Sequence, residues 1–225
     1  MKISSNFYDA KRSVPQWKRP NGYLSGPKRA LDLVLAALLL PIVAPLLLLL
    51  YVIVRLDGGP GFYGQTRVGQ YGSRFKCWKL RTMVVNAEQA LEDACARDPK
   101  VAAEWQAMQK LKDDPRITPI GELLRKTSLD ELPQIWNVIR GEMSFLGPRP
   151  FMVEQQKLYT DAGGGDGYFL MRPGISGLWQ TEGRSHTKFV DRIRYDNMYL
   201  AKVSFGYDMW LILRTVMVLL KRTGT

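Results

Sequence analysis

Histidine is almost absent from this sequence of 225 residues, in which His186 is the single example. A metal site with two imidazole ligands is therefore excluded, and a Ser-His-Asp triad would have to use His186. The two cysteines, Cys77 and Cys95, make no disulfide framework and lack metal-ligand spacing, so we expect reduced thiols. Acid–base or nucleophilic chemistry would then fall mainly on carboxylates, whose natural cofactor is a hard cation such as Mg²⁺.

Acidic residues are outnumbered, with 21 Asp and Glu against 32 Lys and Arg, which gives a formal net charge of +11. This balance predicts a polyanionic partner, and nucleic acid, an anionic membrane surface and phosphorylated substrates all fit it. The sequence has no zinc-finger, RRM or helix-turn-helix pattern. Its long apolar segment also argues against nucleic acid, so we expect no nucleic-acid partner.

The apolar segment runs from Leu31 to Val54 with Asp32 as its one charged residue, and it is long enough to cross a bilayer as a helix. Hydropathy alone favours a single transmembrane helix. Pro41 and Pro45 lie four residues apart at its centre, and each removes a backbone hydrogen bond. Each arm is then about ten residues or roughly 15 Å long, which reaches only halfway through the hydrocarbon.

Positive charge flanks this segment on both sides. Residues 1–30 carry seven Lys or Arg against one acid, and residues 55–81 carry six against one. Because a spanning helix is expected to have asymmetric flanks, we favour a re-entrant helix–break–helix in one leaflet, with a transmembrane span as the alternative. Near the C-terminus, "FGYDMWLILRTVMVLLKR" predicts an interfacial amphipathic helix.

Two cations stand at the start of the apolar segment. Lys28 and Arg29 lie four and three residues before Asp32, so either can pair with it at the membrane boundary. They can instead extend toward the membrane interface, or hold a lipid phosphate.

The rest of the chain predicts a mainly α fold with a small β-hairpin. Aromatic and β-branched residues punctuated by glycine predict the hairpin just after the apolar segment. The element order matches neither a Rossmann nor a P-loop arrangement. Helices are expected at 84–112 (interrupted by Pro99), 121–126, 129–140, 151–160 and 188–201.

The stretch "RKTSLDELPQIWN" places Asp130 and Glu131 side by side where a helix is expected to begin. Ser128 followed by Glu131 three residues later fits a capping box, and acids suit the positive end of a helix dipole. Pro133 would then be the fifth helical residue and would remove a backbone hydrogen bond. From these residues alone, a helix cap and a catalytic pair both stay open.

Arginines recur beside glycine or proline in segments expected to be irregular. Examples are Arg149 in "GPRP" and Arg172 in "MRPG". One such arginine is most simply a solvated surface residue. Several together predict phosphate binding, because a guanidinium group can bind phosphate with two parallel hydrogen bonds.

Five segments occur in a fixed order: "KRALD", "GPGFYGQTRVG", "KLRTM", "SLDELPQIWNVIRGEMSFLGPRP" and "RPGISGLWQTEGRS". Together they resemble the monotopic phosphoglycosyl transferases, also called bacterial sugar transferases or polyprenyl glycosylphosphotransferases, in their small minimal form. The resemblance runs from about Pro27 to the C-terminus. It implies a re-entrant membrane helix at 27–55 and a cytoplasmic catalytic domain at 56–225 that ends in the interfacial helix. Residues 1–26, a basic and aromatic extension, have no family counterpart.

The resemblance also implies an activity. Such enzymes transfer a sugar 1-phosphate from a UDP-sugar to polyprenyl (undecaprenyl) phosphate and release UMP. They act on the cytoplasmic face of the bacterial inner membrane, in the first membrane step of glycan or exopolysaccharide synthesis. "GLWQTEGRS" resembles members that handle plain hexoses, which favours UDP-glucose or UDP-galactose.

By the same resemblance Asp130 is the nucleophile that forms a covalent phosphosugar intermediate. Glu131 helps to hold Mg²⁺ together with Asp130, or fixes the geometry of the pair. The phosphate contacts are expected from Arg149 and Arg172 first, and then from Arg125, Arg81, Lys28 and Arg29. Some members have Ser-Pro at the membrane break, where this chain has Ala44-Pro45 and the additional Pro41.

Two other functions compete with this enzyme. The chain could be a non-catalytic, membrane-attached scaffold of a polysaccharide assembly complex, with Asp130 and Glu131 as a helix cap. It could also be a basic nucleic-acid-binding protein with one transmembrane anchor. Formation of a homo-oligomer is left open by the sequence.

Overall fold

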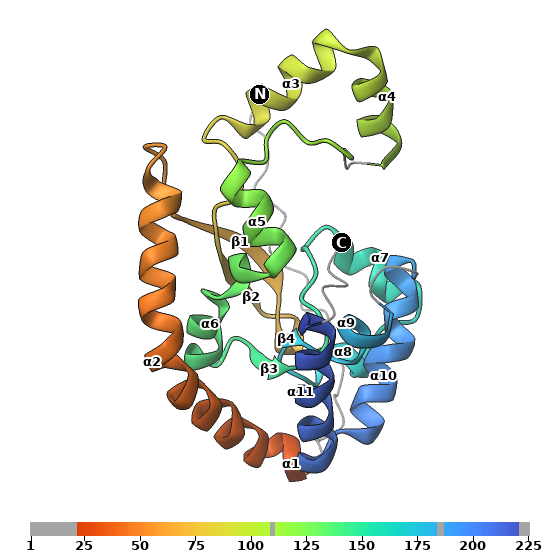
Figure 1. Ribbon diagram of the computed structural model, residues 1–225. Coiled ribbons are helices and arrows are strands. Elements are labelled where there is room, and N and C mark those ends of the chain that lie inside the picture. The colour runs from red at the N-terminus through yellow and green to blue at the C-terminus, as the bar shows by residue number, and fades with distance from the viewer. Residues whose placement is uncertain (1–21, 109–110, 184–186, 221–225) are drawn as a thin grey trace, which may run out of the picture.

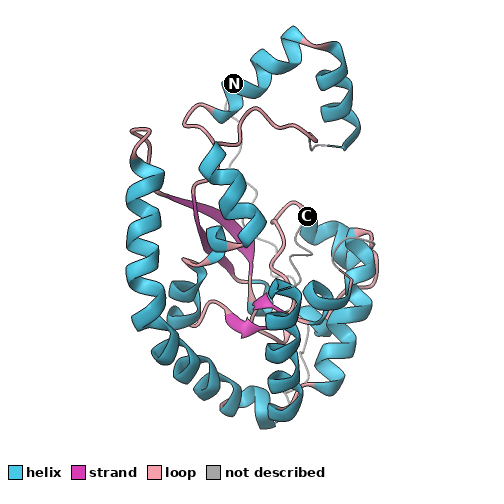
Figure 2. Ribbon diagram, in the orientation of Figure 1, coloured by secondary structure: helices cyan, strands magenta, loops and turns pink. Residues whose placement is uncertain are grey.

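The computed structural model describes residues 22–108, 111–183 and 187–220 (Figure 1). Most of the N-terminal extension and the single histidine, His186, lie outside the described residues. Helices make up most of the described chain, and strands form two small pairs (Figure 2). The prediction of a mainly α fold with a small hairpin is confirmed.

The apolar segment forms one long helix, α2 (Pro27–Arg55), after the short α1 (Gly22–Ser25). Pro27 suits the first turn of α2, where its missing N–H has no partner to lose. The helix runs on through Pro41 and Pro45 and bends partway along its length (Figure 1). The predicted break into two helices is therefore wrong, because the opened turns bend the helix without ending it. The re-entrant arrangement in a membrane stays a prediction.

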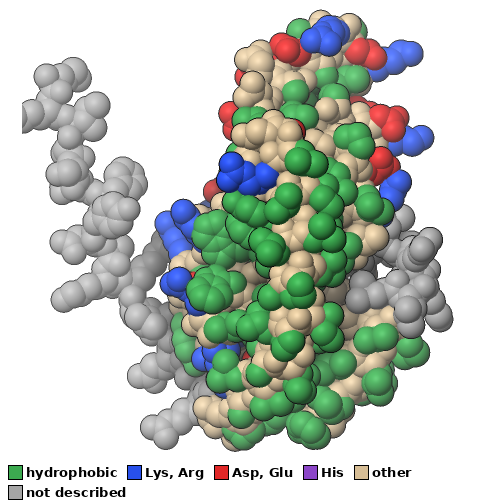
Figure 3. Space-filling model, turned by 60° about the vertical axis from the view of Figure 1, so that its left-hand side comes forward, with side chains coloured by type: hydrophobic (Ala, Val, Ile, Leu, Met, Phe, Trp, Pro, Cys, Tyr) green, Lys and Arg blue, Asp and Glu red, His purple; other side chains and the backbone are tan. Residues whose placement is uncertain are grey.

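By length and composition, α2 is the one helix among the described residues that could cross a membrane. Hydrophobic side chains gather on the face of the molecule that α2 occupies, and charged side chains lie toward its edge and top (Figure 3). An apolar surface of this extent is typical of a contact with a membrane or another protein. The large exposed apolar side chains of α2 are Leu33, Val34, Leu38, Leu39, Leu40, Ile42, Leu46, Leu48, Leu49 and Val52.

The predicted hairpin is present as β1 (Phe62–Val68) and β2 (Arg74–Leu80), which pair antiparallel from Phe62 opposite Leu80 to Val68 opposite Arg74. A 3₁₀ turn, η1 (Gln70–Gly72), joins the strands. The helical pair α3 (Ala87–Arg97) and α4 (Pro99–Met108) follows and stands away from the rest of the molecule (Figure 1). Pro99 begins α4, as expected for a proline in a first helical turn.

The predicted helix at 129–140 is divided. After α5 (Pro119–Thr127), Ser128 has a left-handed backbone with φ 58° and ends that helix. The 3₁₀ turn η2 (Leu129–Glu131) and the separate helix α6 (Gln134–Arg140) come next, with Pro133 between them. Proline lacks the N–H that a continuous helix would need at this point, so α6 starts after it.

A parallel strand pair that the sequence did not predict lies beside these helices. β3 (Ser144–Leu146) pairs with β4 (Gly174–Ser176). Between them the chain forms α7 (Gln155–Asp161) and α8 (Asp166–Phe169), so the helix expected at 151–160 begins four residues late. The chain then forms α9 (Leu178–Glu182), η3 (Phe189–Asp191), α10 (Arg192–Lys202) and α11 (Phe205–Leu220).

The core consists of several side-chain clusters. One is aromatic: Phe151 packs on Tyr168 and Tyr159 with ring centroids 4.3 and 4.9 Å apart. Another places Leu211 of α11 and Tyr199 of α10 against Leu146 of β3. α11 exposes its other face, which carries Phe205, Trp210, Leu213, Val216 and Met217. Its placement at a membrane interface stays a prediction.

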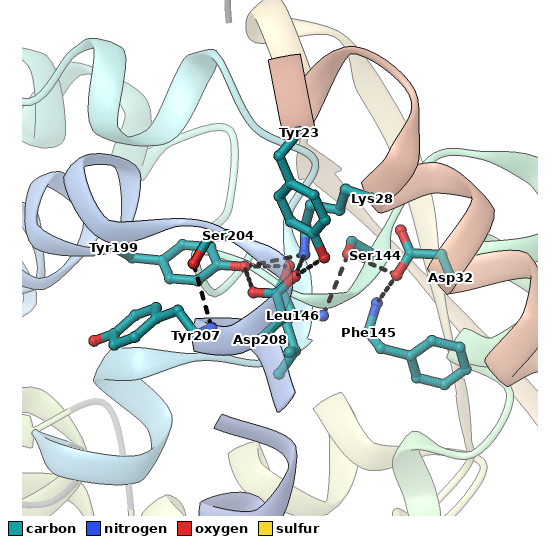
Figure 4. A network of polar contacts seen from close by, with 10 residues as sticks. All are labelled: Tyr23, Lys28, Asp32, Ser144, Phe145, Leu146, Tyr199, Ser204, Tyr207 and Asp208. Carbon is teal, nitrogen blue, oxygen red and sulfur yellow. Dashed lines mark hydrogen bonds and ion pairs between the residues drawn. The ribbon is translucent and has the colours of Figure 1, made fainter. Parts of the chain in front are cut away.

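A buried polar network joins the start of α2 to α11 (Figure 4). Lys28 Nζ lies 2.6 Å from Asp208 Oδ2, and Asp208 is fully buried. Tyr199 donates to Asp208 Oδ1 at 2.6 Å, and Tyr23 donates to Asp208 Oδ2 at 2.9 Å. This network satisfies the buried carboxylate on both oxygens and holds the first turn of α2 against the C-terminal helices.

The expected pairing of Asp32 with Lys28 or Arg29 is wrong. Asp32 Oδ1 accepts hydrogen bonds from Ser144 Oγ at 2.9 Å and from the Phe145 amide at 3.0 Å (Figure 4). Arg29 donates to the carbonyls of residues 138 and 139, at the end of α6. The polar residues at the start of α2 therefore bind α11, β3 and α6, elements that are distant in the sequence.

The free edge of β2 is closed by a side chain. Asn137 of α6 is fully buried, accepts from the Trp78 amide at 3.1 Å and donates to the Lys76 carbonyl at 2.7 Å. It also donates to Glu142 Oε2 at 2.6 Å. Because alternate backbone groups of a strand point to the same edge, one amide side chain can satisfy both of them. Asn137 thus fixes α6 against β2.

Replacing this side chain tests its role. We expect Asn137→Ala to lower the free energy of unfolding by about 2–4 kcal/mol, because two backbone groups lose their partners at about 1–3 kcal/mol each. The measurement is the unfolding midpoint in detergent. Asn86→Ala is the matched control, because Asn86 is exposed and makes no side-chain cap hydrogen bond. Equal midpoints for the two variants would contradict this role.

Candidate active site

Asp130 and Glu131 lie on the 3₁₀ turn η2, in the reversal between α5 and α6. The left-handed Ser128 makes this reversal, and its side chain forms no capping hydrogen bond. The Glu131 carboxylate contacts Lys79 and Arg149 rather than a helix terminus. The capping-box interpretation is therefore wrong.

Lys79 joins the two carboxylates. Its Nζ lies 3.1 Å from Asp130 Oδ2 and 2.8 Å from Glu131 Oε1. The side chain comes from β2, next to the backbone groups that Asn137 fixes. Lys79 was not predicted from the sequence, although it alternates with Phe75 and Cys77, which are buried on the same face of β2. A lysine on the inward face of a strand was the available signal.

A cavity opens beside this pair. Arg149 lies at its wall and places Nη2 3.2 Å from Glu131 Oε1. Arg67 of β1, which was not predicted from the sequence either, donates to Gln65 and lies 3.5 Å from the Pro150 carbonyl. Asp130 is not part of the lining, but it is connected to it through Lys79. The residues that line the cavity are Arg67, Cys77, Lys79, Glu131, Gln134, Arg149, Pro150 and Gly174.

The two carboxyl groups have different electrostatic environments. Burial raises the pKa of Asp130 and the charge of Glu131 adds to this, whereas Lys79 and Arg125 oppose it and leave the pKa above its ordinary value. Burial also raises the pKa of Glu131, but Arg149 and Lys79 outweigh this effect and lower the pKa to about 2. Glu131 is therefore ionised at neutral pH, and Asp130 is the more basic of the two carboxylates. Such a separation of pKa values is typical of paired acids with distinct roles.

Close packing of glycines brings two loops to the cavity. A Cβ on Gly174 would lie 2.1 Å from the Gly147 nitrogen, and a Cβ on Gly147 would lie 2.4 Å from the Arg172 carbonyl oxygen. The backbone hydrogen bond from the Gly174 amide to the Pro148 carbonyl, 2.8 Å long, joins the same loops. Only residues without a side chain allow this approach, which places Arg149 and Gly174 together at the wall.

The structure does not gather all the predicted phosphate-binding cations at this cavity. Arg172 donates to the Gly141 carbonyl at 2.9 Å and lines a second, smaller cavity with Lys28 and Asp32. Three others line neither of these cavities and contact protein groups instead. Arg29 binds the end of α6, Arg125 donates to Thr82 Oγ1 at 2.9 Å, and Arg81 pairs with Asp57. Phosphate contacts by these five residues stay predictions.

A magnesium site is only partly provided by the protein. Within 22–108, 111–183 and 187–220, no group of three or more Asp, Glu, His or Cys side chains is arranged to hold a metal. Asp130 and Glu131 offer two carboxylates, and Lys79 already bridges them. Because Mg²⁺ is often held by one or two carboxylates and substrate phosphates, this donor set fits a metal that arrives with its substrate.

The chain is similar to a family of known sugar transferases. Residues 23–222 match the family model described as bacterial sugar transferase. The chain is 47% identical over 197 residues to the UDP-galactose-lipid carrier transferase of Erwinia amylovora, with 88% of this chain and 41% of the relative covered.

Two further relatives have similar coverage of this chain. It is 36% identical to the UDP-glucose:undecaprenyl-phosphate glucose-1-phosphate transferase of Klebsiella pneumoniae, over 90% of this chain and 41% of the relative. It is 42% identical to the exopolysaccharide production protein ExoY of Sinorhizobium fredii, over 88% of this chain and 86% of the relative. The chain thus spans less than half the length of the first two relatives and most of the third.

The pKa of Glu131 predicts a dependence of stability on pH. A carboxyl group whose pKa falls from 4.5 to about 2 on folding stabilises the protein above pH 4.5, and this stabilisation is lost as the pH falls to 2. Its size is about 3 kcal/mol. We expect Glu131→Gln to be less stable than the wild type at pH 7 and the difference to shrink toward pH 2.

The unfolding midpoint measured from pH 2 to 7 checks this expectation. Glu122→Gln is the matched control, since the Glu122 side chain is 61% exposed in a surface pair with Lys126. Its difference from the wild type should stay small throughout. A constant difference for Glu131→Gln over the same range would show that the carboxylate is not stabilised by Lys79 and Arg149.

Proposed function

Because the chain belongs to the bacterial sugar transferase family, we propose that it is a phosphoglycosyl transferase. It moves a sugar 1-phosphate from a UDP-sugar to polyprenyl phosphate, as the undecaprenyl phosphate in the name of the Klebsiella relative suggests, and releases UMP. The observation that carries this proposal is the Asp130–Glu131 pair, joined by Lys79 beside a cavity lined by Arg67 and Arg149. Carboxylates beside a cationic cavity suit chemistry on a phosphorylated substrate.

The cationic lining of the cavity suits the diphosphate part of the donor. Arg67, Arg149 and Lys79 supply the positive charge that neutralises phosphate oxygens, and arginine can bind them with two parallel hydrogen bonds.

In the proposed first step, an Asp130 oxygen attacks the phosphorus atom that bears the sugar. The bond to the bridging oxygen breaks, UMP leaves with the electron pair, and an acyl phosphate to the sugar remains on Asp130. The raised pKa of Asp130 makes its carboxylate a stronger nucleophile than an ordinary aspartate, while Lys79 favours the ionised form. Glu131, which stays ionised, holds Lys79 and Arg149 in place.

In the second step, a phosphate oxygen of polyprenyl phosphate attacks the same phosphorus atom. The Asp130 carboxylate leaves, and the product is a polyprenyl diphosphate sugar. Two displacements replace one difficult exchange between a soluble donor and a lipid acceptor. Asp130 is regenerated as the anion, so no external acid, base or oxidant is required.

Magnesium is part of the proposal. Glu131 and Asp130 would hold it together with donor phosphate oxygens, and the bound ion would neutralise phosphate charge. Lys79 lies between the same two carboxylates, so it has to share them with the ion when substrate binds.

The proposal includes an arrangement of the protein in the membrane. We propose that α2, which contains Pro41 and Pro45, enters one leaflet from the cytoplasmic face and returns to it, with its bend as the deepest part. Both flanks of α2 are basic, which favours the cytoplasmic face of the inner membrane for each. The exposed apolar faces of α2 and α11 would then contact lipid and bring the cavity to the level of the acceptor headgroup.

The donor is proposed to be a UDP-hexose and the product a precursor of an exopolysaccharide. Galactose and glucose appear in the names of two relatives, and exopolysaccharide production in that of the third. The alternative of a non-catalytic scaffold required the acidic pair to be a helix cap, a role that the contacts of Ser128 and Glu131 contradict.

The decisive experiment measures UMP release from a panel of UDP-sugars with undecaprenyl phosphate and Mg²⁺. We expect release with UDP-glucose or UDP-galactose, and a loss of at least about a thousandfold in Asp130→Asn, which removes the nucleophile. EDTA should abolish the wild-type rate.

Asp161→Asn is the matched control, because Asp161 is exposed and pairs with Lys157 along α7. It should retain the wild-type rate. Equal rates for wild type and Asp130→Asn would overturn the covalent mechanism. If the wild type were inactive with every donor, the result would favour the non-catalytic scaffold.

Membrane topology is tested by labelling both flanks of α2. Ser25→Cys and Leu56→Cys place one thiol on each exposed flank, in a Cys95→Ser background. We expect a membrane-impermeant maleimide to label both thiols in inverted vesicles and neither in intact spheroplasts. Labelling of one thiol from each side would mean that α2 spans the membrane.

A further inference from the structure

Arg192, the first residue of α10, is a buried cation outside the acidic pair. It is 3% exposed, and its guanidinium group donates a hydrogen bond to the backbone carbonyl of Arg149. Arg149 in turn contacts Glu131. Arg192 therefore reaches the wall of the cavity through the backbone of Arg149.

Aromatic rings and one carboxylate hold this guanidinium group. It lies 5.5 Å from the ring centroid of Phe151, 5.2 Å from that of Trp179 and 5.3 Å from that of Phe189. Arg192 Nε lies 3.8 Å from Asp196 Oδ2, and the two side chains are 4% and 2% exposed. Rings on several sides and an ion pair leave the guanidinium group little freedom to turn.

Asp196 is itself fixed by a further contact. The buried Tyr159 hydroxyl donates to Asp196 Oδ2 at 2.9 Å. Burial raises the pKa of Asp196 to about 7, although Arg192 and Tyr159 oppose the rise. A buried pair of this kind contributes little net stability, because both groups lose their hydration. Its contact with the Arg149 backbone points to a role in positioning.

The target of Arg192 is a stiff segment. Arg149 stands between Pro148 and Pro150, so its own backbone is restricted by the following proline and its neighbours have fixed φ. The Gly174 amide holds the Pro148 carbonyl from the other side. When the carbonyl of Arg149 is also held, the direction in which its side chain leaves the backbone is determined.

We propose that Arg192 is a positioning residue for the reaction, which holds the backbone of Arg149 so that the Arg149 guanidinium group meets Glu131 and the donor phosphates. This inference rests on the proposed function and adds a residue that does not touch substrate. Asp196 and Tyr159 complete the chain of contacts by holding Arg192.

The test combines Arg192→Gln with Arg149→Gln in a double-mutant cycle of kcat for UMP release. A small displacement of a binding group can cost up to about a hundredfold in rate, so we expect Arg192→Gln to lower kcat at least about tenfold. If Arg192 acts through Arg149, the double variant is no slower than Arg149→Gln alone. Independent effects that multiply would overturn the inference.

Arg192→Lys is the second variant, because it keeps the charge opposite Asp196 and so protects the fold. It should also be slow, since an ammonium group lacks the planar fork that reaches two partners at once. Arg194→Gln is the matched control on the exposed face of α10 and should keep the wild-type rate. Wild-type kcat in both Arg192 variants would overturn the inference.

Hydrogen exchange of the segment 147–155 gives a readout that does not require activity. Faster exchange there in Arg192→Gln, with unchanged exchange in the hairpin of β1 and β2, supports a local loss of positioning. Equal acceleration throughout the protein would mean that Arg192 acts only on overall stability and would overturn the inference. Inactivity of the wild type would instead overturn the proposed function, whatever the exchange result.

Discussion

The ion pair between Lys28 and Asp208 is the constraint on which the arrangement of the whole molecule depends. It joins the first turn of the apolar helix to the last helix of the described chain, and both side chains are almost completely buried. Breaking such a pair leaves one uncompensated charge inside the protein, at a cost of about 3–5 kcal/mol. Tyr23 and Tyr199 also donate hydrogen bonds to the Asp208 carboxylate, so α2 has one favoured position against the C-terminal helices.

The candidate active site also contains a lysine paired with carboxylates, but here the charges do not balance. Lys79 also lies between acidic groups, but it is shared by two carboxylates beside an open cavity. One lysine cannot neutralise both carboxylates, and the second cation, Arg149, contacts Glu131. The result is one carboxylate that stays ionised and one that is more basic, an asymmetry suited to a nucleophile and its supporting anion.

Features set by neighbouring residues could be predicted from the sequence. Glycine-punctuated β-branched residues indicated the hairpin, and the acidic pair was found because its two members are adjacent. The division of the helix at 129–140 depended on the left-handed Ser128, a conformation that glycine or asparagine would have signalled more clearly. The effect of Pro41 and Pro45 was overestimated as a break, because the other hydrogen bonds of a 29-residue helix keep it continuous.

Contacts between distant segments could not be predicted in this way. The parallel pairing of β3 with β4 joins three-residue strands about thirty positions apart, too short for a periodic pattern. Lys28 was one of two candidate partners for Asp32 because they are one helical turn apart, whereas its partner, Asp208, lies 180 residues away. Lys79 and Arg67 reach the cavity only because the hairpin folds over η2. The local sequence does not predict that this hairpin packs against this turn.

Helix α10 carries three buried polar residues, Arg192, Asp196 and Tyr199, at a spacing of four and three that places them on one face. The first two serve the cavity wall and the third serves the network of Lys28 and Asp208. Inserting or deleting one residue between Arg192 and Tyr199 would rotate these two side chains by about 100° relative to each other around the helix axis. Length variation among natural relatives should therefore be excluded from this helix and accumulate in the projecting pair of α3 and α4, which has no such double attachment.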